Sequence, residues 1–260
     1  MKMTHSAFVR NSITNAAFFA LAAAVFIAFS VYYTRQFGVA QYGYFSFLLN
    51  TVTALISLGA YEGFLITCSL TETRAKFDAF NRRYMIFNAA LVSIAAVVFA
   101  IVTGRLDPGL VLPVMTAIYL DYRSQSSIAV LITNDDNWKI RACRTAYQII
   151  LVTAFLALRH AGLALDHAFA FAVFGASITN YSLLYRYARR NLPETAKGDP
   201  KRADAEPRLL AVAVLSNLAT VLALLLDKLT IRLFDVGTDY SVGLYFLFFD
   251  LATRARRFTC

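Results

Sequence analysis

Two oppositely charged residues lie in the middle of a long apolar segment, residues 109–133. They are Asp121 and Arg123, and four polar residues follow them directly: Ser124, Gln125, Ser126 and Ser127. An ionisable side chain inside a membrane-spanning helix costs at least about 2.5–3.5 kcal/mol on insertion, so it usually faces water or a partner. Because residues two apart on a helix point in nearly opposite directions, Asp121 and Arg123 cannot pair along one face. At least one of them is therefore expected to interact with a group outside this helix.

This polar block has two open interpretations, a binding cavity and a structural ion pair. In the first, a hydrated, cationic central cavity receives an anionic substrate, which Arg123 binds together with Arg10 at the inner mouth. Asp121 and Gln125 are then further candidate substrate contacts. In the second, the charges pair with side chains of neighbouring helices and bind nothing. We favour the cavity.

Three other acidic residues in apolar segments are candidates for ion coupling: Asp227, Asp250 and Glu62. Loss of water around a carboxylate favours its protonated form, which allows proton exchange near neutral pH. Asp227 is the first choice, because the adjacent Lys228 can extend to the membrane surface whereas the shorter carboxylate cannot. Structural pairing with a cation is the alternative for all three. Whether the coupling ion is a proton or sodium is left open.

The residue types that catalysis or metal binding needs are not spaced for those roles. The histidines form no ligand pair or catalytic triad, and Cys68, Cys143 and Cys260 have no metal-ligand spacing. The chain also has no glycine-rich phosphate loop and no nucleophile elbow. We therefore expect no metal, no other cofactor and no enzymatic activity. An integral-membrane glycan-processing enzyme, such as a polymerase or acyltransferase, is kept as an alternative.

The composition indicates an all-α polytopic membrane protein with about eight transmembrane helices. The chain is 58% hydrophobic with a mean hydropathy of +0.56, whereas soluble domains contain roughly 45–50% apolar residues. A membrane-spanning helix needs about 20 mostly apolar residues. The expected spans are 13–34, 44–66, 84–103, 109–133, 145–158, 164–185, 209–234 and 242–253. The fifth is short, and its helix is expected to begin before residue 145.

The basic residues alternate between the ends of these spans. Most of the 25 lie on one side, including Arg10, the cluster 74–83, the cluster 139–144 and the cluster 186–208, whereas Arg35, Arg105, Arg159 and Arg232 lie on the other. Since basic residues are retained on the cytoplasmic face, the N-terminus is expected to be cytoplasmic. The outer loops are expected to be short, for example 36–42. Tyrosines near span ends, such as Tyr33 and Tyr42, are expected to be interfacial anchors.

The chain is expected to contain one complete six-helix lobe and the beginning of a second. Residues 1–190 hold six spans, and residues 191–207 form a cytoplasmic linker rich in proline and charge. The pattern around 232–246 then repeats the pattern around 35–45, which indicates an internal repeat. Residues 208–260 would be the first two helices of a truncated second lobe. Those helices are expected to expose an apolar face and to leave Asp250 without a close partner.

Several short motifs carry a resemblance to a known family. They are Thr34-Arg-Gln-Phe-Gly-Val-Ala-Gln-Tyr-Gly-Tyr-Phe-Ser-Phe-Leu48, Leu58-Gly-Ala60, Asp227-Lys-Leu-Thr-Ile-Arg232 and Val242-Gly-Leu-Tyr245. With these motifs the chain resembles the polysaccharide (O-antigen or capsule) flippases of the multidrug/oligosaccharidyl-lipid/polysaccharide exporter superfamily. It departs from them in having about eight spans rather than at least twelve, and in an acidic residue, Glu62, near the inner end of the second span.

The resemblance implies a function in surface polysaccharide synthesis. A family member moves a polyprenyl-diphosphate-linked oligosaccharide across the bacterial inner membrane, and its partners are that lipid-linked substrate, membrane lipids and other polysaccharide-assembly proteins. Nucleic acid is not an expected partner. A drug or cation antiporter of the same superfamily and an inactive truncated product are the remaining alternatives.

Overall fold

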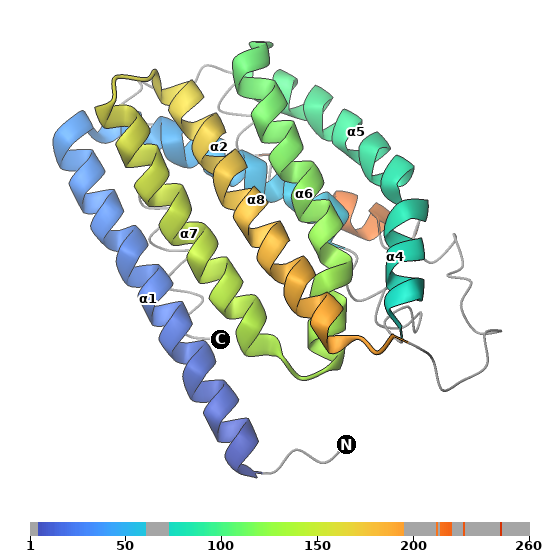
Figure 1. Ribbon diagram of the computed structural model, residues 1–260. Coiled ribbons are helices and arrows are strands. Elements are labelled where there is room, and N and C mark those ends of the chain that lie inside the picture. The colour runs from blue at the N-terminus through green and yellow to red at the C-terminus, as the bar shows by residue number, and fades with distance from the viewer. Residues whose placement is uncertain are drawn as a thin grey trace.

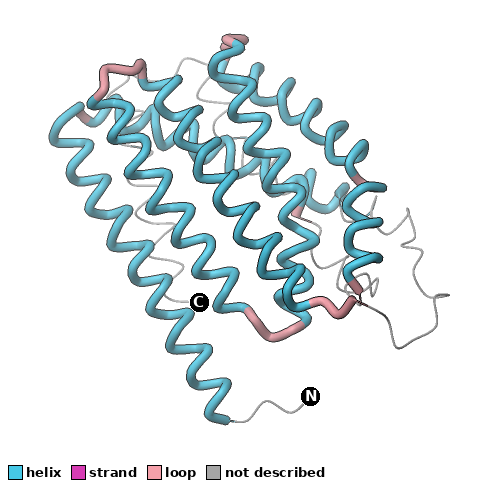
Figure 2. Tube along the Cα trace, in the orientation of Figure 1, coloured by secondary structure: helices cyan, strands magenta, loops and turns pink. Residues whose placement is uncertain are grey.

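The described part of the protein is helical and contains no strand (Figures 1 and 2). A computed structural model describes residues 5–60, 73–194, 212, 214–219, 226 and 245, with side chains from residue 12 onward except at position 83. The helices are α1 (His5–Phe37), α2 (Val39–Ile56), the short 3₁₀ turn η1 (Ser57–Gly59), α4 (Arg74–Arg83), α5 (Met85–Thr103), α6 (Pro108–Thr133), α7 (Asn137–His160) and α8 (Leu165–Asn191).

Four of the described helices are long and apolar enough to cross a membrane. They are Ser12–Phe37, Met85–Thr103, Asn137–His160 and Leu165–Asn191. This supports a helical membrane protein, although the expected count of eight spans is not confirmed. As expected, the fifth predicted span begins before residue 145, at Asn137. The seventh and eighth predicted spans lie largely outside the described residues.

Within the seventh predicted span, the described residues contact the first helices at two points. Asn217 donates a hydrogen bond of 2.9 Å from Nδ2 to the carbonyl oxygen of Ala60, and Val214 packs against the hydrophobic core. Val212, Leu215 and Leu226 are each more than 60% exposed.

The long helices lie in a row, in the spatial order α1, α7, α8, α6 and α5, and α2 crosses behind them (Figure 1). The most extensive contacts are those of α8 with its two neighbours, α6 and α7. The strip of α8 that enters these contacts is built from small side chains, with Ala168, Ala172 and Ala176 each fully buried. Small residues allow close approach of helices, which is the usual packing solution where lipid removes the hydrophobic driving force.

Aromatic rings form the core where α1, α2 and α7 meet. Phe29, Phe45 and Phe155 are at most 2% exposed, with ring centroids 5.0 Å apart for Phe29 and Phe45 and 4.6 Å apart for Phe45 and Phe155. Tyr33 and Tyr42 belong to the same cluster, at 0% and 1% exposed. The expectation that these two tyrosines are interfacial anchors is therefore wrong. Their hydroxyl groups are satisfied inside the bundle instead, by Gln41 and Ser30 respectively.

The turn between α1 and α2 is a single residue, Gly38, so the expected loop 36–42 is much shorter than predicted. Gly38 has φ 88° and ψ 160°, a conformation that essentially only glycine adopts. The chain can therefore reverse within one residue and resume a helix at once. Tyr42 consequently lies one turn inside α2, where it faces the core.

Within the second predicted span, 44–66, the α-helix ends at Ile56 and the 3₁₀ turn Ser57–Gly59 follows it. Residues 61–66 of that span lie outside the described residues. Tyr122 of α6 explains the ending, because its hydroxyl donates a hydrogen bond of 2.7 Å to the carbonyl oxygen of Leu55. Its ring also lies against Gly59, where an added Cβ atom would come within 2.1 Å of the ring. A helix that continued with ordinary side chains would collide with this ring.

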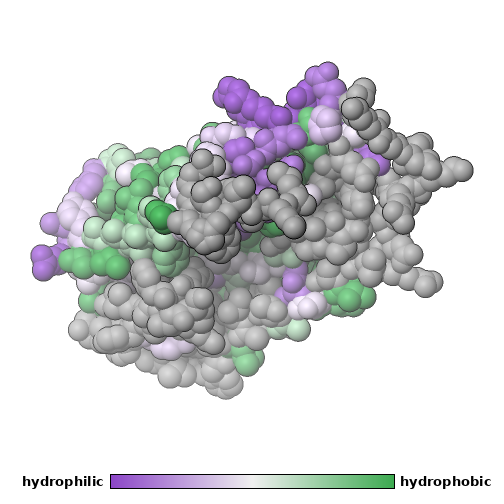
Figure 3. Space-filling view, turned by 90° about the horizontal axis from the view of Figure 1, so that it is seen from below, coloured by the Kyte–Doolittle hydropathy of each residue, from purple (hydrophilic) through white to green (hydrophobic). Residues whose placement is uncertain are grey.

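The connections between helices gather at two ends of the bundle (Figure 1). Residues 104–107 and 161–164 lie at one end, where Arg105 pairs with Asp166 and His167 Nε2 lies 3.2 Å from Asp107 Oδ2. Residues 134–136 and 192–194 lie at the other. In the view from below, hydrophilic side chains project at that end while hydrophobic ones cover part of the flank (Figure 3). The described residues of the clusters 74–82, 139–144 and 186–190 belong to this polar end.

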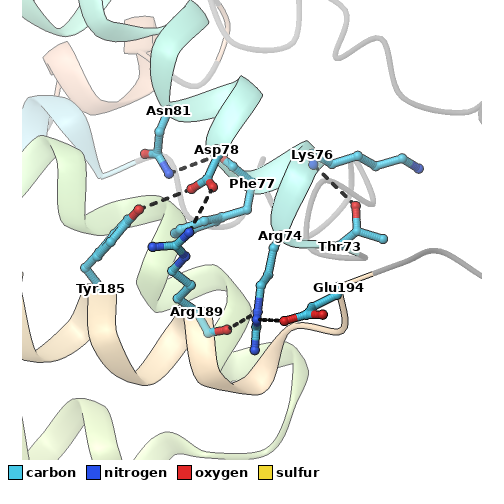
Figure 4. A network of polar contacts seen from close by, with 9 residues as sticks. All are labelled: Thr73, Arg74, Lys76, Phe77, Asp78, Asn81, Tyr185, Arg189 and Glu194. Atoms are coloured by element: carbon cyan, nitrogen blue, oxygen red, sulfur yellow. Dashed lines mark hydrogen bonds and ion pairs between the residues drawn. The ribbon is translucent and has the colours of Figure 1, made fainter.

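The short amphipathic helix α4 is fastened to the lower end of α8 by a polar network (Figure 4). Asp78 accepts a hydrogen bond of 3.2 Å from the hydroxyl group of Tyr185 and lies 3.8 Å from the guanidinium of Arg189. Arg74 Nη1 pairs with Glu194 Oε1 at 2.6 Å, and its Nε donates to the carbonyl oxygen of Arg189. These contacts hold α4 along the end of the bundle.

Candidate functional site

The candidate site is the polar block in the second half of α6. The helix begins at Pro108 because the Asp107 side chain caps it, accepting a hydrogen bond of 2.9 Å from the backbone N–H of Gly109. Proline suits the first helical position, where its missing N–H has no partner to lose. From this fixed start, α6 carries its polar residues to the level where α2, α4 and α8 all approach it.

Asp121 points to α8. Its Oδ2 atom accepts a hydrogen bond of 3.3 Å from Ser177 Oγ, and its Oδ1 lies 3.5 Å from Asn180 Nδ2. Both partners are buried, at 1% and 6% exposed. On the neighbouring helix α7, Arg144 and Tyr147 lie close enough to influence this carboxylate electrostatically. The carboxylate therefore belongs to a cluster of three helices.

Arg123 takes part in a different set of contacts. Its Nη1 donates a hydrogen bond of 3.3 Å to the hydroxyl group of Tyr119, and its guanidinium lies 6.0 Å from the centre of that ring. The Nε atom is buried without a hydrogen-bond partner. Among the described residues, no carboxylate lies within ion-pair distance of Arg123. As the sequence spacing predicts, Asp121 and Arg123 do not pair with each other.

The remaining four residues of the block, Ser124 to Ser127, are buried and differ in their hydrogen bonds. Ser126 donates to Asn81 Oδ1 of α4 at 2.9 Å and so links α4 to α6. Ser124 donates to the backbone of its own helix. Gln125 and Ser127 are 5% and 0% exposed, and the Gln125 Oε1 and Ser127 Oγ atoms have no hydrogen-bond partner in the described part of the chain. Burial of a polar atom without a hydrogen-bond partner costs folding free energy, so these two atoms mark the block as a candidate ligand-binding position.

The other predicted site residues cannot be placed relative to this block. Arg10 lies in the first turns of α1, but its side chain is outside the described residues. Glu62, Asp227 and Asp250 also lie outside them. The structure thus describes Asp121, Arg123 and Gln125 of the predicted set, and it separates the first two into different surroundings.

Sequence reasoning missed three residues that face Asp121: Ser177, Asn180 and Tyr147. Ser177 and Asn180 are three apart on α8, so they lie on one face of that helix. This i, i+3 pair of polar residues in an apolar span was the available signal. Tyr147 carries no comparable signal, because a single tyrosine in an apolar helix is ordinarily a packing residue.

The geometry offers two distinct chemistries. The surroundings of Asp121 are rich in oxygen atoms and suit a cation, whereas Arg123 presents a guanidinium group that suits an anion. Among the described residues, no group of three or more His, Cys, Asp or Glu side chains is placed to hold a metal ion.

Comparison with known proteins gives no match. No family model, no curated protein and no solved structure is significantly similar to this chain.

Proposed function

We propose that the chain is a membrane transporter of the flippase type, which moves a polyprenyl-diphosphate-linked oligosaccharide across the bacterial inner membrane. The proposal starts from a physical requirement: a diphosphate and a sugar chain cannot cross hydrocarbon without a polar path. A protein with positively charged side chains inside the membrane meets that requirement, because these side chains can bind the diphosphate while the lipid tail stays in the bilayer. The motif resemblance of 34–48 and 58–60 to the polysaccharide flippases supports the same class.

The observation that best supports the proposal is the set of groups around the Arg123 side chain. Its guanidinium group donates a hydrogen bond to an uncharged tyrosine, has no carboxylate within ion-pair distance among the described residues, and keeps a buried Nε atom without a hydrogen-bond partner. An arginine held inside a membrane protein without a carboxylate is expected to serve an anionic ligand. The planar guanidinium is well suited to phosphate, which it binds with two parallel hydrogen bonds. Gln125 is the second group proposed to contact the substrate.

The proposed orientation follows from the charges at the two ends of the bundle. We place the end with 74–82, 139–144 and 186–190 in the cytoplasm, together with the N-terminus, because basic residues are retained on that side. In this arrangement the substrate would move from the cytoplasmic to the periplasmic leaflet. The orientation is tested with the variant Arg190→Cys and a thiol reagent that cannot cross the membrane. If residue 190 is cytoplasmic, this cysteine should be labelled only after the membrane is opened.

The test of function is a leaflet-flipping assay with the full chain in proteoliposomes. The substrate is a polyprenyl-diphosphate-linked oligosaccharide, and its appearance in the outer leaflet is followed with an impermeant glycan-modifying enzyme. Arg123→Ala should lower the flipping rate about 10- to 100-fold, as expected for loss of hydrogen bonds to a charged group, about 1.5–3 kcal/mol. Arg123→Lys should retain part of the flipping rate, because lysine keeps the positive charge but lacks the paired N–H donors of the guanidinium group.

The matched control is Arg190→Ala, which removes an exposed arginine at the end of α8 and should leave the rate unchanged. Each variant is first checked for a single, monodisperse species in detergent. If the wild-type chain moves no lipid-linked glycan, the proposed function is wrong. If it does so and Arg123→Ala is unimpaired, Arg123 is not a substrate-binding residue.

A further inference from the structure

Helix α4 covers the contact between α6 and α8 near the polar end of the bundle. Phe77 of α4 is 2% exposed and packs in one cluster with Val130 of α6 and Ala188 of α8. Val130 follows the polar block on α6, about 6 Å beyond Ser126 at the rise of an α-helix. Phe77 therefore lies on the side of the block that faces the polar end. One turn further along α4, Asn81 reaches the block itself and accepts a hydrogen bond of 2.9 Å from Ser126.

The start of α4 is held to the last turns of α8 by polar side chains (Figure 4). The guanidinium of Arg74 pairs with Glu194 at 2.6 Å and donates to the carbonyl oxygen of Arg189 at 3.0 Å. One turn later, Asp78 lies 3.8 Å from the guanidinium of Arg189 and accepts a hydrogen bond from the hydroxyl group of Tyr185. We call these five residues, Arg74, Asp78, Tyr185, Arg189 and Glu194, the clasp.

The other end of α4 is joined to α5 through a single residue, Tyr84, and the two helices meet there at an angle (Figure 1). Tyr84 has φ −89° and ψ 6°, and its backbone N–H still donates to the carbonyl oxygen of Phe80 at 3.0 Å. Hinges are commonly residues at the ends of helices that absorb a change in backbone dihedral angles. A change at Tyr84 can therefore turn α4 as a unit without unwinding it.

The contacts of the clasp are the ones that water can most readily replace. The side chains of Asp78 and Arg189 are 30% and 54% exposed, and those of Arg74 and Glu194 are 34% and 80% exposed. Exposed ion pairs contribute little to stability and are screened by salt. Water admitted to the polar block can also hydrogen-bond to its two unpartnered oxygen atoms, which offsets part of the cost of opening.

We propose that α4 is a hinged cover over the polar block, which turns about Tyr84 and is held shut by the clasp. In the closed state, Phe77 and Asn81 separate the block from water at the polar end. In the open state, the clasp is broken and the block is accessible from that end. Opening requires no ligand, so the cover does not depend on the proposed function. Its use in admitting the head group of a substrate to Arg123 does rest on that function.

Opening is measured as the rate at which a cysteine beneath Phe77 reacts with an uncharged maleimide. The probe is Val130→Cys in the purified full chain in detergent, with Cys68 and Cys260 replaced by alanine. Val130 is fully buried against Phe77, so labelling of the probe requires α4 to move. Cys143 is 1% exposed and belongs to a separate apolar cluster, so its labelling reports unfolding of the bundle. Mass spectrometry of peptides measures the two rates separately in one sample.

Variants of the clasp should speed labelling of the probe but not of the buried native cysteine. Asp78→Ala removes an ion pair and a hydrogen bond from the clasp, so the rate at the probe should rise at least about threefold. Asp78→Asn should raise it less, because asparagine keeps an acceptor for Tyr185. Adding Arg189→Ala to Asp78→Ala should change the rate little further, since the two residues share one ion pair. The matched control is Asp166→Ala, which breaks the ion pair with Arg105 at the opposite end and should leave the rate at the probe unchanged.

Two results would overturn the hinged cover. One is a labelling rate at the probe that is the same with Asp78→Ala as with an intact clasp. The other is a parallel rise at the probe and at Cys143, which would mean that Asp78 only contributes to the stability of the whole bundle. Neither result bears on flipping by Arg123. A chain that opens as expected but moves no glycan would contradict the proposed function and leave the cover intact.

Discussion

Gly59 is the position where one added methyl group should destabilise the protein most specifically. A Cβ atom at this residue would lie 2.1 Å from Cδ1 of Tyr122 and 2.6 Å from both Cγ and Cε1. Ordinary contacts of a Cβ atom are about 3.4–4 Å long, so the ring must move by more than 1 Å. Tyr122 is fully buried, and its hydroxyl donates to the carbonyl oxygen of Leu55 at 2.7 Å. A ring that moves away loses that hydrogen bond.

The expected cost of Gly59→Ala is the sum of these two effects. Overpacking of a buried site costs typically about 1–3 kcal/mol, and loss of a buried hydrogen bond adds about 0.5–1.5 kcal/mol. We therefore expect a loss of about 2–4 kcal/mol, which corresponds to a melting temperature about 5–15 °C lower for a chain of this size. The measurement is thermal unfolding of the detergent-solubilised protein, followed by circular dichroism.

Gly175 provides the matched control for this substitution. It lies within α8, and a Cβ atom added there meets nothing within 4 Å. Gly175→Ala should therefore be neutral or stabilise the helix by up to about 1 kcal/mol. The same experiment is then repeated with Tyr122 changed to Ala, where the collision is absent and Gly59→Ala should cost little. The reasoning is refuted if the two glycine substitutions unfold alike, or if Gly59→Ala costs as much without the ring as with it.

Two further predictions concern the ends of helices. Gly38→Ala places a side chain at φ 88° and ψ 160°, so it should lower stability by about 1–3 kcal/mol, and a melting temperature equal to that of Gly175→Ala would contradict the strain argument. Asp107→Ala removes the cap on the N–H of Gly109 and should cost about 0.5–2 kcal/mol. Asp107→Asn keeps a capping oxygen while removing the charge beside His167, so thermal unfolding should place it closer to wild type than Asp107→Ala.

The sequence alone determines the local features of this protein. In a membrane every backbone N–H and C=O group must be satisfied within its own segment, so a long apolar run has to become a helix. The predicted segments 84–103 and 109–133 match α5 and α6 to within one residue at each end, and α5 is among the four described helices long and apolar enough to cross a membrane, whereas α6 is not. The spacing of Asp121 and Arg123 likewise dictates that they face different surroundings, because the helical period fixes the angle between them.

The tertiary structure decides which helices are neighbours and hence what each side chain meets. Asp121 faces Ser177 and Asn180, 56 and 59 residues away in the chain, and no local pattern encodes that pairing. Tyr33 and Tyr42 lie near predicted span ends, yet they are buried because Gly38 folds α2 directly onto α1. Helix formation depends on each segment by itself, whereas burial and partnership depend on packing between segments distant in sequence, which the structure alone supplies.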